Sequence, residues 1–208
     1  MIIYLSRHGK TDWNADEIMG GYSDCPRICG EGITQALRTV DYIVGENVPI
    51  REIFSSPLTR AIQTVNPLAK TLRNTPICFD ELMEMNLGLY EGFPYRHGQE
   101  IMEAQDHDLY RRYPGGGECY DDLVKRVSRV IDPLRLLNRG NYYVQAHYLT
   151  NRVILAMLLN LDFYKKPELM TKIKVDNSVI YKIDTVKFIC SWHDVLSGTQ
   201  GDGLLYCS

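Results

Sequence analysis

The sequence lacks three features that would indicate common functional classes: a long apolar run, paired cysteines and an excess of basic residues. No apolar stretch reaches the roughly 18 residues that a membrane-spanning helix needs, so we expect no contact with a membrane. The six cysteines are scattered and none forms a CxxC pair, which favours reduced thiols over a zinc site. A formal net charge of −3 argues against a nucleic-acid-binding protein.

The first residues also lack the features of a secretory leader. The chain begins MIIYL and reaches Arg7 almost at once, which leaves no room for the apolar core of a signal peptide. A length of 208 residues, 45% of them hydrophobic, fits one globular domain spanning residues 1–208. We therefore expect a cytoplasmic, single-domain protein whose core needs neither metal nor disulfide.

Short apolar runs alternate with helical stretches along the chain. Strands are predicted at 2–6, 51–55, 76–79 and 142–146, and an antiparallel hairpin at 178–183 and 187–192. Ile33, Leu37, Val40 and Val44 recur at helical spacing and form one apolar stripe, the kind that packs on a core.

Two prolines and a glycine run set the expected limits of other helices. Ser56 and Pro57 should open a helix as its cap and first residue, and Pro67 should kink that helix or end it early. Residues 99–112 read as a polar helix that ends at the following proline and glycines, within a small helical lid insertion at about 93–117. Together the elements predict an α/β three-layer sandwich, with a mostly parallel central sheet and helices on both faces.

Three predicted strands run directly into residues that suit phosphate chemistry. Arg7 and His8 follow the first strand, Arg60 lies one turn beyond the second, and His147 follows the fourth. Ligands of such sheets bind beyond the carboxyl ends of the strands, so we expect these four side chains to converge. Guanidinium groups match phosphate oxygens, and a neutral imidazole can attack phosphorus. A buried carboxyl group from loop 81–91, with a raised pKa, could protonate the leaving oxygen.

Six ordered segments, spanning nearly the whole chain, resemble the histidine phosphatase superfamily, also called phosphoglycerate-mutase-like. They are 7–14 (RHGKTDWN), 55–64 (SSPLTRAIQT), 82–92 (LMEMNLGLYEG), 116–120 (GGECY) followed by Arg126, 145–147 (QAH) and 177–179 (NSV). The resemblance implies that His8 is a phosphorylated nucleophile and that Glu84 gives a proton to the leaving group and then takes one from water. The implied phosphate-binding residues are Arg7, Asn14, Arg60 and His147. It also implies a small phosphorylated substrate and no metal or organic cofactor.

The chain departs from the family pattern at Tyr148, where the family usually has glycine. Glycine permits a positive φ and close backbone approach. The tyrosine could instead narrow the pocket or touch substrate through its hydroxyl, so Tyr148 is a candidate substrate contact. Asn14 could simply cap a turn. Trp13 is expected in the core, and the second RHG tripeptide at 96–98 is interpreted as a surface or lid segment.

These observations predict a phosphomonoesterase that hydrolyses a small phosphorylated metabolite through a phosphohistidine on His8. Two alternatives stay open: a 2,3-bisphosphoglycerate-dependent phosphoglycerate mutase, and a catalytically silent phosphate-binding scaffold, which Tyr148 supports best. Such mutases are generally longer and carry an ERHYG-like string where this chain has EMNLG at 84–88, which favours the phosphatase. Whether the chain forms a homodimer is left open by the sequence.

Overall fold

The computed structural model describes residues 1–104, 110–137, 139–162, 165 and 172–206. Within them one sheet has the strand order β3-β2-β4-β1-β5-β6-β7. The strands are β1 (Ile2–Arg7), β2 (Glu52–Ser55), β3 (Ile77–Cys78), β4 (Asn141–Ala146), β5 (Val179–Asp184), β6 (Ile189–Asp194) and β7 (Gln200–Asp202). The first four in the sheet order are parallel, and β5, β6 and β7 continue the sheet in antiparallel pairs. The predicted hairpin is thus confirmed.

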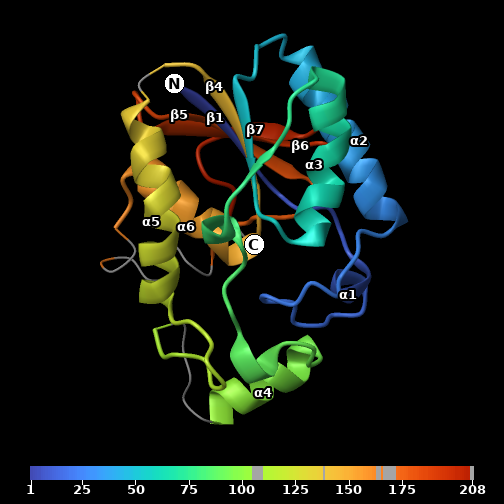
Figure 1. The fold of residues 1–208 in the computed structure, drawn as a ribbon, viewed down its shortest axis with the longest axis vertical. Coiled ribbons are helices and arrows are strands. Elements are labelled where there is room, and N and C mark those ends of the chain that lie inside the picture. The colour runs from blue at the N-terminus through green and yellow to red at the C-terminus, as the bar shows by residue number, and fades with distance from the viewer. Residues whose placement is uncertain (105–109, 138, 163–164, 166–171, 207–208) are drawn as a thin grey trace.

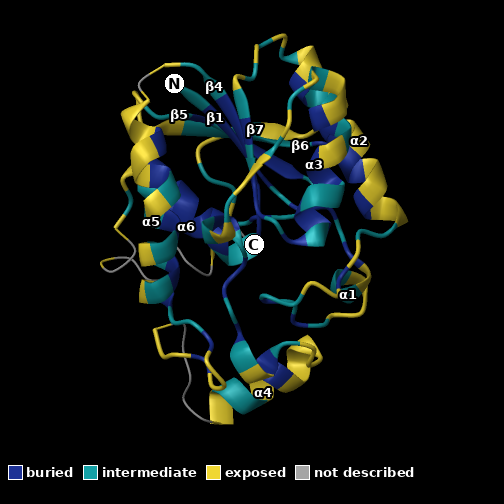
Figure 2. Cartoon of the chain, in the orientation of Figure 1, coloured by how far each residue is buried: buried dark blue, intermediate teal, exposed yellow. Residues whose placement is uncertain are grey.

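Helices cover both faces of the sheet (Figure 1). One face is covered by α2 (Gly30–Gly45) and α3 (Thr59–Leu72), and the other by α5 (Tyr120–Leu136) and α6 (Tyr148–Leu159). Side chains alternate between two apolar clusters, so that Ile3 and Leu5 belong to the α5–α6 side and Tyr4 to the α2–α3 side. Figure 2 shows the central strands largely buried. The predicted α/β sandwich is confirmed.

The prediction of one apolar stripe packed on the core is wrong for three of its four residues in α2, since only Val40 packs against a core cluster. Ile33, Leu37 and Val44 are 50%, 53% and 49% exposed, whereas the polar Gln35 is 3% exposed. The loop after β1 sets the rotation of the helix. A Cβ on Gly32 would lie 2.2 Å from the carbonyl oxygen of Lys10, and Gln35 Oε1 accepts a 2.7 Å hydrogen bond from the backbone N–H of the same lysine.

Helix α3 also differs from the expectation. It begins at Thr59, with Leu58 as its cap, and it continues through Pro67 to Leu72. The hydroxyl of Ser56 accepts a hydrogen bond from the N–H of Leu58 and also meets a buried histidine, so it does not cap the helix. Pro67 cannot donate a backbone hydrogen bond within the helix. Buried apolar residues on both sides of it, including Val65 and Leu68, compensate by packing on the core.

The remaining elements lie at the carboxyl end of the parallel strands. They are α1 (Asp12–Ala15), the 3₁₀ turns η1 (Asp80–Leu82) and η2 (Gly88–Tyr90), and α4 (Tyr95–Ala104). The polar helix predicted at 99–112 therefore begins earlier, residues 110–112 are not helical, and 105–109 lie outside the described residues. In Figure 1, α4 lies at one end of the molecule, away from the sheet. No described helix is long and apolar enough to cross a membrane.

Candidate active site

The two predicted histidines lie side by side where β1 and β4 end. The backbone N–H of His8 donates to Ala146 O at 3.0 Å, so the pairing of the two strands continues one residue beyond β1. His147 is the cap residue of α6. The ring centroids of His8 and His147 are 5.1 Å apart at an interplanar angle of 55°. Both rings are buried, with exposed fractions of 4% and 0%.

One hydrogen bond fixes the proton position on His8. Its Nδ1 lies 2.9 Å from Gly9 O, and because a carbonyl oxygen can only accept, Nδ1 carries the hydrogen. Nε2 therefore keeps its lone pair. Burial lowers the pKa of His8 well below 6.5, and the positive charges of Arg7 and Arg60 lower it further. The geometry thus presents a neutral imidazole with a nucleophilic Nε2.

Ser56 orients the second histidine. His147 Nε2 lies 2.7 Å from Ser56 Oγ, which also accepts a hydrogen bond from the N–H of Leu58 at 3.3 Å. In the tautomer in which the serine hydroxyl donates to Nε2, the histidine hydrogen lies on Nδ1. Among the described residues, this buried Nδ1 has no hydrogen-bond partner. Burial, followed by Arg60 and His8, lowers the pKa of His147 well below 6.5.

One buried and one partly buried guanidinium group lie next to the histidines. Arg60 is 3% exposed and donates to Ser23 O and Gly21 O at 2.7 and 2.8 Å. Burial lowers its pKa to about 10. Arg7 donates to Val175 O at 3.4 Å, and its buried Nε has no partner among the described residues. Their bonded partners are neutral carbonyls, so an anion would offset the cost of burying these two charges.

Glu84 lies at the start of α6. Its Oε1 accepts hydrogen bonds from the N–H groups of Met85, Leu149 and Thr150, at 3.0, 3.2 and 3.2 Å. Its Oε2 accepts one from the same N–H of Leu149, at 3.2 Å. The carboxylate therefore binds the free N–H groups of a helix start beside His147.

Two further charged residues hold the loop that carries Glu84. Arg126 donates to the carbonyl oxygens of Glu81 and Met83 at 2.8 and 3.0 Å. Glu91 Oε1 accepts from the N–H groups of Tyr22 and Leu87 at 2.7 and 3.1 Å. Both side chains therefore support the loop backbone.

A cavity of about 880 Å³ opens from this cluster toward α4. Glu84 lies in its wall, together with four cationic and four aromatic side chains. These are Arg7, Lys10, Arg96, Arg152, Trp13, Tyr95, Tyr113 and Tyr148. Trp13, expected in the core, thus lines the cavity. Arg96 of the second RHG tripeptide reaches the cavity from α4, although its side chain is 89% exposed.

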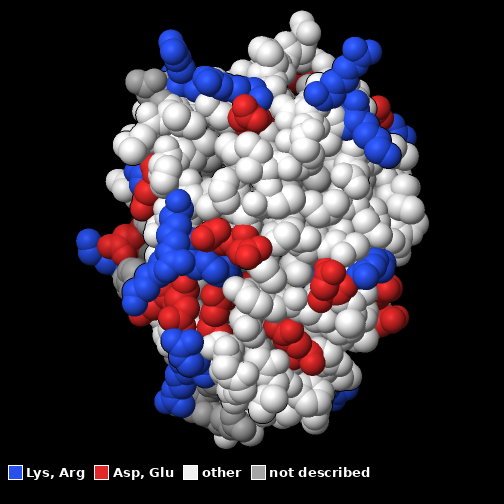
Figure 3. Space-filling model, viewed as in Figure 1, with Lys and Arg blue, Asp and Glu red and all other residues white. Residues whose placement is uncertain are grey.

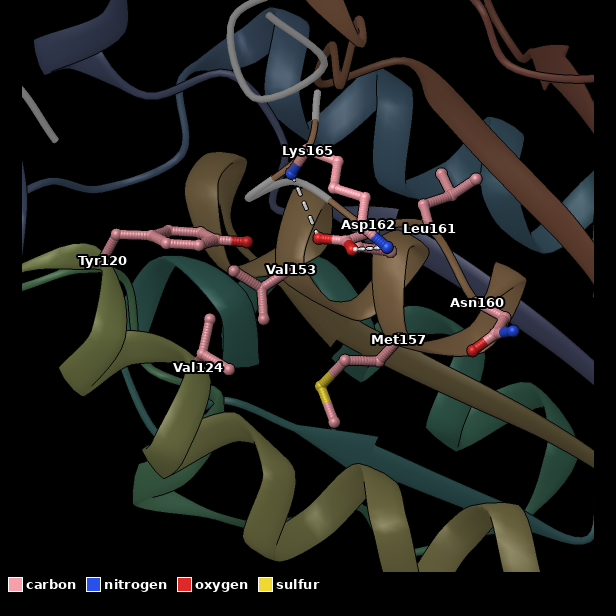
Figure 4. Close-up of a pocket in the computed structure, with 9 residues that line it drawn as sticks. Tyr120, Val124, Val153, Met157, Asn160, Leu161, Asp162 and Lys165 are labelled. Carbon is pink, nitrogen blue, oxygen red and sulfur yellow. Dashed lines mark hydrogen bonds and ion pairs between the residues drawn. The ribbon is translucent and has the colours of Figure 1, made fainter. Parts of the chain in front are cut away.

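A second cavity, of about 500 Å³, lies between α5 and α6 (Figure 4). Its described lining is mostly apolar, with Val124, Val153 and Met157 among the side chains drawn, and an ion pair joins Lys165 to Asp162 at 3.2 Å. None of the described residues that line it is an arginine. The larger cavity is lined by Arg7 and Glu84 and is therefore the better candidate, while His8, Arg60 and His147 are not among its lining residues.

The backbone at Tyr148 does not adopt the positive φ that would favour glycine. Tyr148 is the first residue of α6 and its φ is not positive. The guanidinium carbons of Arg7 and Arg152 lie 5.0 and 4.0 Å from its ring centre, and its hydroxyl accepts from Arg152 Nη2 at 2.5 Å. Arg152, which is only 2% exposed, was not among the site residues predicted from the sequence. The signal was present, because Arg152 is the one charged residue in the apolar stretch 150–161.

Asn14 has a capping role in the structure. Its N–H donates to Thr11 Oγ1 at 3.0 Å, and its Oδ1 accepts from the N–H of Thr11 at 3.2 Å, which forms a capping box for α1. It also lines the large cavity. Its role as a phosphate contact stays a prediction.

Charge on the outside is mixed. On the face shown in Figure 3, Lys and Arg side chains lie beside Asp and Glu, and a broad area carries neither. The positive charge at the candidate site therefore comes from individual side chains around the cavity and not from a basic surface on this face. Among the described residues, no group of three or more His, Cys, Asp or Glu side chains could hold a metal ion.

Comparison with known sequences gives a family match over most of the chain. The model of the histidine phosphatase superfamily (branch 1) matches residues 3–187. The 6-phosphofructo-2-kinase/fructose-2,6-bisphosphatase of Caenorhabditis elegans is 31% identical over 170 residues, which cover 79% of this chain and 34% of that protein. A human relative, 6-phosphofructo-2-kinase/fructose-2,6-bisphosphatase 4, is 29% identical over 90% of this chain and 38% of its own length. The chain thus spans little more than a third of these curated relatives.

Solved structures with the same fold cover the chain from end to end. A mycobacterial glucosyl-3-phosphoglycerate phosphatase superposes with a TM-score of 0.74 at 21% identity and covers 100% of this chain and 99% of its own. A putative alpha-ribazole-5'-P phosphatase from Escherichia coli gives a TM-score of 0.72 at 22% identity and covers 100% and 96%. At this level of identity the likeness shows the fold.

Proposed function

Because the chain belongs to the histidine phosphatase superfamily (branch 1), we propose that it is a phosphomonoesterase that works through a phosphohistidine on His8. The observation that carries the proposal is the imidazole of His8, which is buried beside His147 and keeps its hydrogen on Nδ1 through the bond to Gly9. This leaves Nε2 as a neutral nucleophile next to Arg7 and Arg60.

In the first proposed step, His8 Nε2 attacks the phosphorus, and the bond from phosphorus to the ester oxygen breaks. Arg7, Arg60 and the Nδ1–H of His147 stabilise the charge on the transferring oxygens. The leaving alkoxide takes a proton from Glu84. The proton most readily sits on Oε2, because only one N–H donates to that oxygen whereas Oε1 accepts several hydrogen bonds.

In the second proposed step, water attacks the phosphohistidine and releases inorganic phosphate. Glu84, now a carboxylate, takes a proton from that water, which restores its starting state. The nitrogen–phosphorus bond breaks and His8 becomes neutral again, with its hydrogen still on Nδ1. No metal ion or organic cofactor enters either step.

We further propose that the substrate is a small phosphorylated sugar or sugar derivative with a second anionic group. Fructose 2,6-bisphosphate and glucosyl-3-phosphoglycerate, in the names of two relatives, both fit this class. Arg152 supports the proposal because its guanidinium lines the cavity near Arg7, with the ring of Tyr148 beside both. The aromatic residues Trp13 and Tyr95 offer faces for a sugar ring.

A panel of phosphorylated metabolites, assayed for released phosphate at several pH values, tests the proposal. We expect turnover by the wild-type protein and none above background by His8→Ala. Binding of inorganic phosphate without turnover of any ester would favour the scaffold. Isomerisation of phosphoglycerate that depends on 2,3-bisphosphoglycerate would favour the mutase.

A further inference from the structure

A short irregular segment, residues 173–177, forms hydrogen bonds with two arginine side chains and one backbone carbonyl of the candidate site. We call it the support segment. Its contacts run from Arg152 Nε to Ile173 O (2.7 Å), from Arg7 Nη1 to Val175 O (3.4 Å) and from Asn177 Nδ2 to His8 O (2.6 Å). Two carbonyl oxygens of this segment therefore help to position two guanidinium groups, and the Asn177 side chain holds the backbone of His8.

Residues 174–176 belong to no helix or strand, so other contacts must hold the support segment. Residues 204–206 supply them. The N–H of Lys174 donates to Leu205 O at 2.7 Å, and an isolated antiparallel bridge pairs Ile173 with Tyr206. Tyr181, in β5, joins the two segments, because its hydroxyl donates to Lys174 O at 2.8 Å and accepts from the N–H of Leu205 at 3.2 Å.

We propose that residues 204–206 are a positioning element of the active site, which acts by clamping the support segment that orients Arg152, Arg7 and His8. The family match ends at residue 187, so this element lies outside the matched range. Long, rotatable arginine side chains bind an anion best when they are already oriented, and a fixed carbonyl acceptor supplies that orientation. The inference rests on the proposed function only where turnover is measured.

The Tyr181→Phe variant tests the clamp without removing buried apolar surface. The hydroxyl that joins the support segment to residues 204–206 is lost, while the ring stays in the core. Tyr4→Phe is the matched control: it also removes one hydroxyl from a buried tyrosine of the sheet, but that hydroxyl bonds to Glu46, away from the site. Binding of inorganic phosphate is measured by calorimetry on folded protein.

For Tyr181→Phe we expect the dissociation constant for phosphate, and the KM for any turned-over ester, to rise by roughly 2- to 12-fold, the effect of one net hydrogen bond. We expect Tyr4→Phe to bind phosphate like the wild type, even if both variants unfold at lower temperatures. Equal phosphate affinity in the two variants would overturn the proposal, because it would show that the tyrosine hydroxyl affects stability alone.

Two further measurements keep the clamp separate from the phosphatase proposal. In the ligand-free protein, the Nε–H of Arg152 should exchange with water faster in Tyr181→Phe than in Tyr4→Phe, by NMR, and equal exchange would refute the clamp whatever the enzyme does. A chain that ends at Gly203 should lose more phosphate affinity than one that ends at Tyr206, and equal affinity would also refute it. If phosphate binds but no ester is hydrolysed, only the phosphatase proposal fails.

Discussion

Removing the hydroxyl of Ser56 should disable His147 without touching either histidine. Ser56→Ala deletes the 2.7 Å contact to His147 Nε2 and the 3.3 Å bond from the N–H of Leu58. Ser56 and His147 are both 0% exposed, so water cannot replace the lost partner. A buried polar group left unsatisfied costs about 1–3 kcal/mol. If the catalytic orientation of His147 becomes less favourable by that free energy, kcat/KM should drop by roughly 5- to 150-fold.

The assay compares kcat/KM and phosphate affinity in Ser56→Ala with those in the neighbouring variant Ser55→Ala. Ser55 is equally buried, but its hydroxyl donates to the carbonyl oxygen of Ser56 at 2.9 Å and does not contact the histidine. Urea unfolding measures the stability of both. We expect similar losses of stability and a loss of activity in Ser56→Ala alone. Equal activity in the two variants would refute the assignment of Ser56 as the residue that orients His147.

Three other perturbations have definite expected outcomes. Gly9→Ala should lower the free energy of unfolding by about 1–3 kcal/mol, because its Cβ would lie 2.6 Å from Gly32 O, whereas Gly20→Ala should cost far less. His8 and His147 have pKa values held well below 6.5, so the unfolded chain takes up protons first as the pH falls. The unfolding free energy of the ligand-free protein should then fall below pH 6.5 by up to about 1.4 kcal/mol per pH unit for each histidine, and His8→Asn should remove one share of that slope. Glu84→Gln should lower kcat/KM, which reports the transfer to His8, about 100- to 10,000-fold on an alkyl phosphate, and much less on p-nitrophenyl phosphate, whose phenolate leaves without a proton.

The convergence of the site was predictable because parallel strands end at one edge of a sheet. Residues placed directly after β1 and β4, such as His8 and His147, meet for that reason alone. The contacts that tune them were not readable from the sequence. Ser56 looked like a helix cap, and Arg152 stood out as the one charge in an apolar stretch but without an indicated partner. Both depend on how α3 and α6 pack against the strands, which local sequence does not encode.

The rotation of α2 shows where an apolar pattern misleads. Ile33 and Leu37 have the spacing of a buried stripe, yet the helix turns Gln35 inward. Close backbone approach at Gly9 and Gly32 brings the helix onto the loop after β1, and Gln35 then satisfies the N–H of Lys10. Fitting the helix to the loop after His8 therefore outweighs the burial of two aliphatic side chains.

Trapping the covalent intermediate tests the central claim most directly. Wild-type protein mixed with a substrate identified in the panel should be quenched in alkali within one turnover, because phosphohistidine is labile in acid, and then digested and sequenced by mass spectrometry. The account predicts one phosphate on His8, attached through Nε2, and none in His8→Ala. Phosphate found on another residue, or on Nδ1 of His8, would contradict it, as would sustained turnover by His8→Ala.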